Sequence, residues 1–233
     1  MKKVAILQSN YIPWKGYFDL INMVDEFILY DDVQYTTNDW RNRNKIKTLQ
    51  GTQWLSIPVL HKGRVHQKIK ETEIITSKWA EKHWRALQCN YSKAPYFEEY
   101  YSHIQELYRR GKEEKYLSQV NYIFIKSICD ILGIKTKISW SSEYILESGK
   151  TERLVSICKQ AQAKEYISGP AASNYIVEKL FEIDDITLTY MDYSNYPEYP
   201  QMYGQFVQEV TILDMLFHLG SQTQEYMKSF SFE

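Results

Sequence analysis

Cysteine is scarce in this sequence. Only three occur among 233 residues, at positions 89, 129 and 158, and no two of them form a CxxC pair. An odd number of widely spaced cysteines argues against a disulfide framework and against a zinc site built on cysteine pairs. His61, His66, His103 and His218 lack metal-ligand spacing as well. We therefore expect no metal site and a reducing, cytoplasmic location.

Long apolar runs and an excess of charge of one sign are also missing. No run approaches the roughly 20 apolar residues that a membrane-spanning helix needs, and the apolar segment 4–7 is too short for the core of a signal peptide. The 28 basic side chains nearly cancel the 29 acidic ones, which leaves a net charge of -1. These features predict no membrane insertion and no nucleic-acid partner.

Glycine-containing cofactor signatures are absent too, because the sequence has no Walker loop, no GxGxxG and no GxSxG. No cofactor is therefore obvious from motifs. What is abundant is aromatic: 20 tyrosines and 6 tryptophans supply most of the 15% aromatic content. Tyrosine joins an apolar ring to a hydroxyl group, so tyrosine-rich sequences often build polar pockets on which a ligand can stack.

Short apolar runs alternate with helical patterns near both ends of the chain. Residues 4–7 and 27–30 are typical of buried strands, and 18–24 between them has apolar residues at helical spacing. This order within about 30 residues indicates a parallel βαβ unit. The alternation returns later, with strands expected at 136–140, 165–169 and 186–193 and helices at 151–163, 171–181 and 209–220. The pattern predicts an α/β fold with an open, mainly parallel, Rossmann-like sheet.

Residues 38–130 interrupt this alternation. Polar and apolar residues alternate over 38–47, 51–60 and 65–74, as in antiparallel or edge strands. The stretch 77–132 has helical periodicity, with Ser77 as a cap and Gly133 at its end. We therefore expect a single α/β domain over residues 1–233, with a helical and antiparallel insertion at about 38–130.

Polar residues follow three of the expected parallel strands. They are Gln8, Asn10 and Tyr11 after the first, Asp31, Asp32 and Gln34 after the second, and Ser168, Gly169 and Asn174 after a later one. Ligands bind outside the carboxyl ends of the strands in an open α/β sheet. Each group by itself could simply form a turn or cap a helix. Three such groups at the ends of parallel strands favour a crevice that binds a ligand. We expect Asn10, Tyr11, Asp31, Asp32 and Ser168 to border one concave site, where the pKa of one of the two neighbouring acids is raised.

The stretch LQSNYIPWKGYFDL, residues 7–20, joins the first strand to the first helix. Trp14 and Tyr17 offer rings on which a base or a sugar can stack, and Gly16 permits close approach of the backbone. The loop is similar to the H-x-G-H loop of HIGH-type nucleotidyltransferases and pantothenate synthetases, whose histidines hold the phosphates of ATP. Trp14 and Tyr17 stand at the two histidine positions here.

Cations recur at every second position of WRNRNKIK, residues 40–47. On a strand, Arg41, Arg43, Lys45 and Lys47 would share one face, with Asn42 and Asn44 on the other. Arginine side chains suit diphosphates and carboxylates, so we expect this face to meet a nucleotide diphosphate. The alternative is a solvated edge strand that is protected by its charges.

Proton transfer needs a titratable side chain in the site. Asp32 is our first candidate for the base, His83 the second, and Asp31 is the neighbouring acid. His83 lies at helical spacing from Trp79, where a histidine can equally be a packed core residue. Asn90 and Tyr91 follow His83 two turns later and are candidates for substrate contact.

Six motifs together carry a family resemblance: LQSNYIPWKGYFDLI, DDVQYTTNDWRNRNKIK, WLSIPV, CNYSKAPYF, ISGPAASNY and YPQMYGQFVQEVTILDMLFHLG. They run in order through nearly the whole chain, which resembles the WbqC-like protein family. Where members usually have LLFNxG, this sequence has His218 in place of the asparagine. The corresponding motif residues here are Gln8, Asn10, Tyr11, Pro13, Trp14, Tyr17, Asp31, Asp32, Gln34, Arg41, Asn42, Arg43, Asn90, Tyr91, Ser168, Gly169 and Gln201.

The resemblance implies a role in bacterial surface polysaccharide biosynthesis, such as that of O-antigen, or of related products. The function expected from it is transfer of an acyl group, with an aminoacyl group favoured, onto the amine of a nucleotide-linked amino sugar. A partner enzyme or carrier protein would supply the acyl donor. One alternative is an amide ligase that forms an acyl-adenylate, in which case ATP is required. Another is a non-catalytic scaffold that binds a nucleotide sugar.

Overall fold

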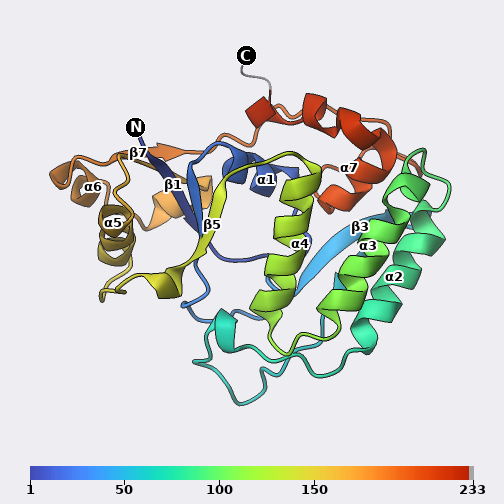
Figure 1. The fold of residues 1–233 in the computed structure, drawn as a ribbon, viewed down its shortest axis with the longest axis horizontal. Coiled ribbons are helices and arrows are strands. Elements are labelled where there is room, and N and C mark those ends of the chain that lie inside the picture. The colour runs from blue at the N-terminus through green and yellow to red at the C-terminus, as the bar shows by residue number, and fades with distance from the viewer. Residues whose placement is uncertain (231–233) are drawn as a thin grey trace.

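A five-stranded parallel sheet forms the centre of the computed structural model, which describes residues 1–230 (Figure 1). Its strands are β1 (Lys3–Leu7), β2 (Glu26–Leu29), β5 (Lys137–Trp140), β6 (Glu165–Ser168) and β7 (Thr187–Tyr190). Their order in the sheet is β5-β2-β1-β6-β7, and every neighbouring pair is parallel. The predicted open, mainly parallel α/β sheet is confirmed.

The chain builds this sheet outward from β1 in two directions. It first adds β2 and β5 on one side, then crosses over and adds β6 and β7 on the other. β1 pairs with β2 through four residues, Val4 to Leu7. With β6 it pairs only through Lys3 and Val4. The carboxyl ends of β1 and β6 are therefore not hydrogen-bonded to each other, and the strand order reverses at this place.

Both faces of the sheet are covered at its centre, which explains why β1 and β2 are short apolar runs rather than alternating ones. Ala5, Phe27 and Leu29 belong to a large core on one face. Val4 and Ile28 belong to a smaller core on the other, as the period of two in a strand requires. Figure 1 shows α1 and α4 on the first side and α5 and α6 on the second. The bounds of these helices are α1 (Lys15–Asn22), α4 (Leu117–Ile131), α5 (Thr151–Gln160) and α6 (Lys179–Ile183).

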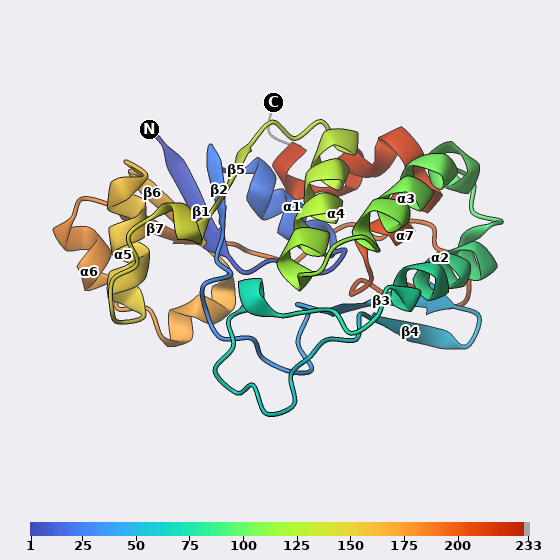
Figure 2. The ribbon, with the colours of Figure 1, turned by 60° about the horizontal axis from the view of Figure 1, so that its bottom comes forward.

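The insertion between β2 and β5 contains a separate antiparallel hairpin and a layer of helices. The hairpin consists of β3 (Arg43–Thr48) and β4 (Gly51–Ser56), and the helices are α2 (Lys78–Tyr91), α3 (Phe97–Gly111) and α4. Figure 2 shows the hairpin running beneath α2 and α3. The sequence predicted both parts of this insertion.

The expected strand at 65–74 is wrong. The 3₁₀ turn η1 (Ile69–Glu71) lies there instead. The turn is closed by its own polar groups, since Lys68 N donates to Glu71 Oε2 at 3.1 Å and Thr72 Oγ1 donates to Lys68 O at 3.0 Å. Its backbone also joins the segment after β2, because Lys70 N donates to Asp31 O at 3.0 Å.

The expected helix at 171–181 is divided into two pieces, η3 (Pro170–Asn174) and α6. Ser173 Oγ donates back to Pro170 O at 2.7 Å, and Thr151 Oγ1 accepts from Val177 N at 3.1 Å. These local bonds offer the backbone an alternative to one continuous helix. The described chain ends with α7 (Ile212–Leu219), η4 (Gly220–Tyr226) and η5 (Lys228–Phe230), while η2 (Ser141–Glu143) follows β5.

Candidate functional site

A cavity of about 380 Å³ lies at the carboxyl ends of β1 and β6, where the strand order reverses. We call it the switch-point cavity. Ligands of open α/β sheets bind at such places. Rings dominate its wall: Trp14, Tyr17, Tyr30, Trp40, Tyr166, Tyr175 and Tyr193. Its polar lining side chains are Gln8, Asn10, Arg41 and Ser168. The cavity thus combines stacking surfaces with a small set of hydrogen-bonding groups, as small-molecule sites do.

Seven of the residues predicted for the site line this cavity. They are Gln8, Asn10, Trp14, Tyr17, Arg41, Ser168 and Gly169. Sequence reasoning did not select the tyrosines at 30, 166, 175 and 193 or Trp40. Tyr30 follows β2 directly, so its position at a strand end was the available signal, whereas Tyr166 lies within β6 and had no such signal. Asn174 is exposed at the end of η3, and Gln34 donates to Val65 O at 2.7 Å; neither lines the cavity.

The loop after β1 has an unusual backbone. Ile12 has a φ of 36°, a conformation that is costly for a β-branched residue. Asn44 of β3 holds it there, because Nδ2 donates to Ile12 O at 2.8 Å and to Tyr11 O at 3.2 Å. Tyr11 N also donates to Trp40 O at 3.1 Å, and Pro13 O accepts from Ile212 N at 2.9 Å. Strain of this kind persists only where surrounding contacts enforce it, and it is concentrated at functional sites.

Gly16 serves a different purpose from the expected close approach of a ligand. A Cβ atom at this position would lie 2.4 Å from Cζ2 of Trp14. The indole of Trp14 therefore lies directly against Gly16, where any larger residue would displace it. The ring is held from the other side by Tyr193, with ring centroids 5.1 Å apart, and by Tyr196 at 5.7 Å.

Arg41 is the cation of the switch-point cavity. It precedes β3, so it does not belong to the strand face where we expected four cations. Its Nη1 donates to Asn10 Oδ1, and its Nη2 lies 3.4 Å from Asp39 Oδ2. The side chain is 13% exposed. A guanidinium group placed in this way can offer its remaining N–H groups to a diphosphate or a carboxylate.

The other three cations of WRNRNKIK have separate surroundings. Arg43 lies with Cζ 4.3 Å from the centroid of Trp54 and donates through Nη2 to Asn38 O. Lys45 lies over the same ring at 5.2 Å. Lys47 is buried by the chain around Gln201. The predicted face of four cations is therefore only partly correct: Arg43, Lys45 and Lys47 alternate along β3 and share a face, but Arg41 precedes the strand and a later segment covers Lys47.

The two asparagines of this stretch have structural partners. Asn44 supports the loop after β1, as described above. Asn42 Nδ2 donates to Ile57 O at 2.8 Å, just beyond the end of β4. The two amides therefore fix different parts of the chain, although they lie only two residues apart.

Asp31 connects the ends of β1 and β2 and does not line the cavity. The carboxylate is 1% exposed and accepts from Ser9 N at 2.8 Å and from Ser9 Oγ at 2.7 Å. Asn121 Nδ2 of α4 donates to the same serine oxygen at 2.9 Å. Burial raises the pKa of Asp31, although hydrogen bonds from Ser118 and Ser9 and the charge of Arg41 oppose the shift. A neighbouring acid is not the cause, in contrast to our expectation.

Asp32 turns away from its neighbour toward a cluster of cations. Its Oδ1 lies 2.5 Å from Lys70 Nζ and 3.5 Å from Lys68 Nζ, and Ser141 Oγ donates to Oδ2 at 3.0 Å. Burial alone would raise the pKa of Asp32, but the hydrogen bonds from Lys70 and Ser141 and the lysine charges lower it. An acid with these partners is a poor proton acceptor near neutral pH, and Asp32 does not line the switch-point cavity.

Tyr11 and His83 lie in the core of the helical layer. Tyr11 Oη is 2.9 Å from His83 Nδ1 and 3.0 Å from Tyr108 Oη. The rings of Trp79 and Phe124 pack edge-on against Tyr11 at 5.8 and 5.7 Å. Burial lowers the pKa of His83 to about 4, although a hydrogen bond with the Ser56 backbone opposes the shift. The expected shared site of five residues is therefore wrong: only Asn10 and Ser168 of that set line the cavity.

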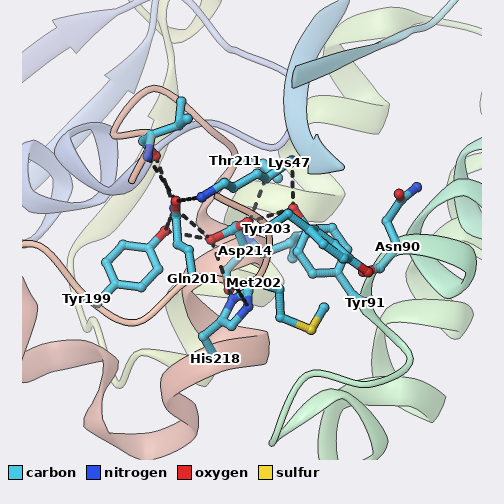
Figure 3. A network of polar contacts seen from close by, with 12 residues as sticks. Lys47, Asn90, Tyr91, Tyr199, Gln201, Met202, Tyr203, Thr211, Asp214 and His218 are labelled. Carbon is cyan, nitrogen blue, oxygen red and sulfur yellow. Dashed lines mark hydrogen bonds and ion pairs between the residues drawn. The ribbon is translucent and has the colours of Figure 1, made fainter. Parts of the chain in front are cut away.

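A second polar cluster lies around the buried Asp214 of α7 (Figure 3). Asp214 accepts hydrogen bonds from Tyr91 Oη at 2.7 Å, Tyr199 Oη at 2.8 Å and Gln201 Nε2 at 3.0 Å. Gln201 Oε1 in turn accepts from Lys47 Nζ at 3.0 Å. Sequence reasoning selected Tyr91 and Gln201 but missed Asp214. The sequence feature that indicated Asp214 was its position as a lone acid in the apolar run ILDMLF.

His218 and the predicted contact residue Asn90 lie at the edge of the Asp214 cluster. His218 Nε2 accepts from Met202 N at 3.0 Å, and His218 Nδ1 lies 2.7 Å from Asp214 O, so the proton of this imidazole is on Nδ1. The side chain of Asn90 points away from the cluster in Figure 3, and its Nδ2 donates to Ala86 O at 2.8 Å. The cluster joins α2, β3 and α7 and is not an open site.

Within residues 1–230, no group of three or more histidine, cysteine, aspartate or glutamate side chains is placed to hold a metal ion. In the same part of the chain, no helix is both long enough and apolar enough to cross a membrane.

Comparison with known proteins agrees with the motifs. The model of the WbqC-like protein family matches residues 8–226. A Mycobacterium tuberculosis protein named "Uncharacterized protein Rv1507c" is 51% identical over 228 residues, which cover 98% of each chain. No solved structure matches. The family model covers every element from α1 to η4 and the residues of the switch-point cavity from Gln8 onward, so the chain belongs to the WbqC-like protein family.

Proposed function

We propose that this protein transfers an acyl group, with an aminoacyl group favoured, onto the amine of a nucleotide-linked amino sugar. The observation that carries the proposal is the switch-point cavity, which unites aromatic walls and one guanidinium group at the carboxyl edge of the sheet. Any nucleobase can stack on an aromatic side chain, because every base has a flat π face. The diphosphate of the same ligand matches the N–H groups of Arg41.

The remaining polar groups fit the sugar portions of such a ligand. Gln8, Asn10 and Ser168 provide amide and hydroxyl groups that can bind ribose or hexose hydroxyls. Tyr17 Oη is already used, because it donates to Gln8 O at 3.0 Å. Its ring therefore acts as a fixed wall, and Trp14 is held by its contacts with Gly16 and Tyr193. A wall of this kind loses little entropy when a ligand binds.

The proposed reaction is a substitution at an activated carbonyl, such as a thioester supplied by a partner enzyme or carrier. The neutral sugar amine attacks the carbonyl carbon, a C–N bond forms, and the C–S bond breaks. The thiolate leaves and takes up the proton that the nitrogen loses. The geometry does not favour Asp31, Asp32 or His83 as the proton acceptor, because none of the three lines the cavity.

A scaffold that binds a nucleotide sugar without chemistry is the second candidate. It is favoured by one observation: no carboxylate or imidazole belongs to the wall of the switch-point cavity, as far as the described residues go. Incubation of the protein with nucleotide-linked amino sugars and acyl thioesters, followed by mass spectrometry, separates the two. Acylated sugar that forms only with the protein present supports the transferase. Binding without any mass gain supports the scaffold.

Arg41→Ala tests the binding step that both candidates share. The loss of a charged hydrogen-bonding group should weaken the affinity for uridine or thymidine diphosphate by about tenfold or more, measured by calorimetry. Arg43→Ala is the matched control, because its guanidinium group lies over Trp54 outside the cavity. Equal losses in the two variants would contradict the assignment of the diphosphate to Arg41. If the protein exchanges labelled pyrophosphate into ATP when an amino acid is present, it forms an acyl-adenylate. That result would support the ligase mechanism in place of acyl transfer from a thioester.

A further inference from the structure

A second, smaller cavity adjoins the switch-point cavity. Its volume is about 260 Å³, and Asn10, Trp14 and Trp40 belong to the walls of both. The remaining lining residues are Pro13, Asn44 and Glu209. This volume lies just below the usual range of small-molecule pockets, so the cavity suits one ring rather than a whole nucleotide. We call it the side compartment.

The side compartment has two chemically different kinds of wall. Pro13 and the indoles of Trp14 and Trp40 form flat apolar surfaces. Asn10, Asn44 and Glu209 form the polar part, and the amide of Asn44 is already occupied by the loop backbone. Flat aromatic faces beside hydrogen-bonding groups suit the ring of a sugar, which has apolar C–H faces and polar edges.

Glu209 is the carboxylate of this compartment, and its backbone is well anchored. It lies on the segment between Gln201 and Thr211, both of which belong to the surroundings of Asp214 (Figure 3). Thr211 N donates to Lys45 O at 2.9 Å, which fixes the segment against β3. The Glu209 side chain itself is 72% exposed. Its carboxylate can therefore receive a group that enters from the cavity.

Lys45 forms an ion pair with Glu209. Its Nζ lies 3.5 Å from Glu209 Oε2, and the same ammonium group lies over the rings of Trp54 and Trp40 at 5.2 and 5.7 Å. A partly solvated pair at this distance contributes little free energy. One carboxylate has about four acceptor positions, so Glu209 keeps capacity for a second cation.

From this arrangement we infer that the side compartment binds the amine-bearing sugar ring, with Glu209 as the carboxylate that receives its ammonium group and then takes up the proton that this group loses before the neutral amine attacks. The inference rests on the proposed function and specifies its substrate. The nucleoside would occupy the switch-point cavity, and the diphosphate would lie near Arg41, whose partner Asn10 belongs to both cavities. The indoles of Trp14 and Trp40 would add cation–π attraction to the same ammonium group.

The test compares nucleotide sugars that differ only in the charge of the amine. The probes are uridine diphosphate glucosamine and its N-acetylated form, the corresponding thymidine diphosphate pair, and the two free nucleoside diphosphates. We expect at least one free-amine sugar to bind more tightly than its acetylated form. Glu209→Gln should weaken binding of that free-amine sugar by about fivefold, the effect of one partly solvated ion pair. It should leave binding of the acetylated sugar and the free diphosphate unchanged.

Glu198→Gln is the matched control, because Glu198 is exposed just before this segment and does not line either cavity. It should bind every probe as the unchanged protein does. The inference is overturned if both members of each pair bind equally and Glu209→Gln alters neither, while the free diphosphates still bind. A complete lack of binding by the diphosphates and the sugars would instead overturn the proposed function, and the inference with it.

Discussion

The imidazole of His83 shows how burial decides the role of a titratable side chain. It is 2% exposed and lies among the rings of Tyr11 and Trp79. Water that would solvate an imidazolium ion is excluded, so burial lowers the pKa of His83 to about 4. At neutral pH the ring is therefore uncharged in both the folded and the unfolded chain.

This pKa predicts a loss of stability in mild acid. The unfolded histidine takes up a proton below about pH 6.5, whereas the folded one resists protonation until about pH 4. The contribution of the neutral His83 ring to the free energy of unfolding is thus fully present above pH 6.5. It falls by about 3 kcal/mol as the pH decreases from 6.5 to 4. Urea unfolding at a series of pH values should show this slope. His83→Gln should flatten it, and His103→Gln on the exposed face of α3 should not. An unchanged slope in His83→Gln would contradict the assignment.

The loop between β1 and α1 is the element on which the candidate site depends. It brings Asn10 and Trp14 to both cavities, and it does so through the costly backbone of Ile12. The amide of Asn44 is the side chain that stabilises this conformation directly. The hairpin therefore has a function beyond covering the helices, because it sets the shape of a loop that precedes it by some 30 residues in the sequence.

Asn44→Ala should separate loop geometry from stability. Loss of two hydrogen bonds to the Ile12 and Tyr11 carbonyls should lower the free energy of unfolding by about 1–3 kcal/mol. It should also weaken uridine or thymidine diphosphate binding severalfold, because the strained loop can relax. Asn42→Ala loses a comparable bond, to Ile57 O, and should lower stability while nucleotide binding is retained. If the two variants bind nucleotide equally well, the loop is not shaped by Asn44.

At the same scale, strands were easier to predict than short turns. Residues 4–7 and 27–30 are apolar because both faces of the sheet are covered, and short apolar runs of this length are typical of buried parallel strands. Residues 65–74 also alternate, but side-chain bonds around Lys68 close a 3₁₀ turn there. Those bonds depend on spacing within one turn, which a two-residue pattern does not reveal.

For the whole molecule, the sequence predicted the place of the cavity better than its chemistry. The rule on strand ends grouped Gln8, Asn10 and Ser168, which line one cavity because parallel strands end at one edge. It failed for Asp32, whose partners Lys68, Lys70 and Ser141 come from distant segments that turn the carboxylate aside. No local pattern specifies such partners. Asp214 was missed for the same reason.

Asp214 joins α7 to α2, to the segment 199–201 and, through Gln201, to β3. It is completely buried, and its hydrogen-bond donors come from α2 and from the segment 199–201, with Lys47 of β3 one step further through Gln201. Burial and the charge of Asp214 raise the pKa of Tyr91, so its hydroxyl remains a donor at neutral pH. Replacement by asparagine puts an N–H₂ group where at least one donor needs an acceptor.

Asp214→Asn should therefore lower the free energy of unfolding by about 2–4 kcal/mol. Because Gln201 would lose its anchor, the amides of residues 199–211 should also exchange hydrogen faster. Asp130→Asn is the control, since it removes only an exposed pair with Lys126 one turn away on α4 and should cost about 0.5 kcal/mol or less. A variant with normal stability and normal exchange would show that α7 docks through its apolar face alone. Faster exchange that also weakens binding of free-amine sugars would connect this buried carboxylate to the position of Glu209.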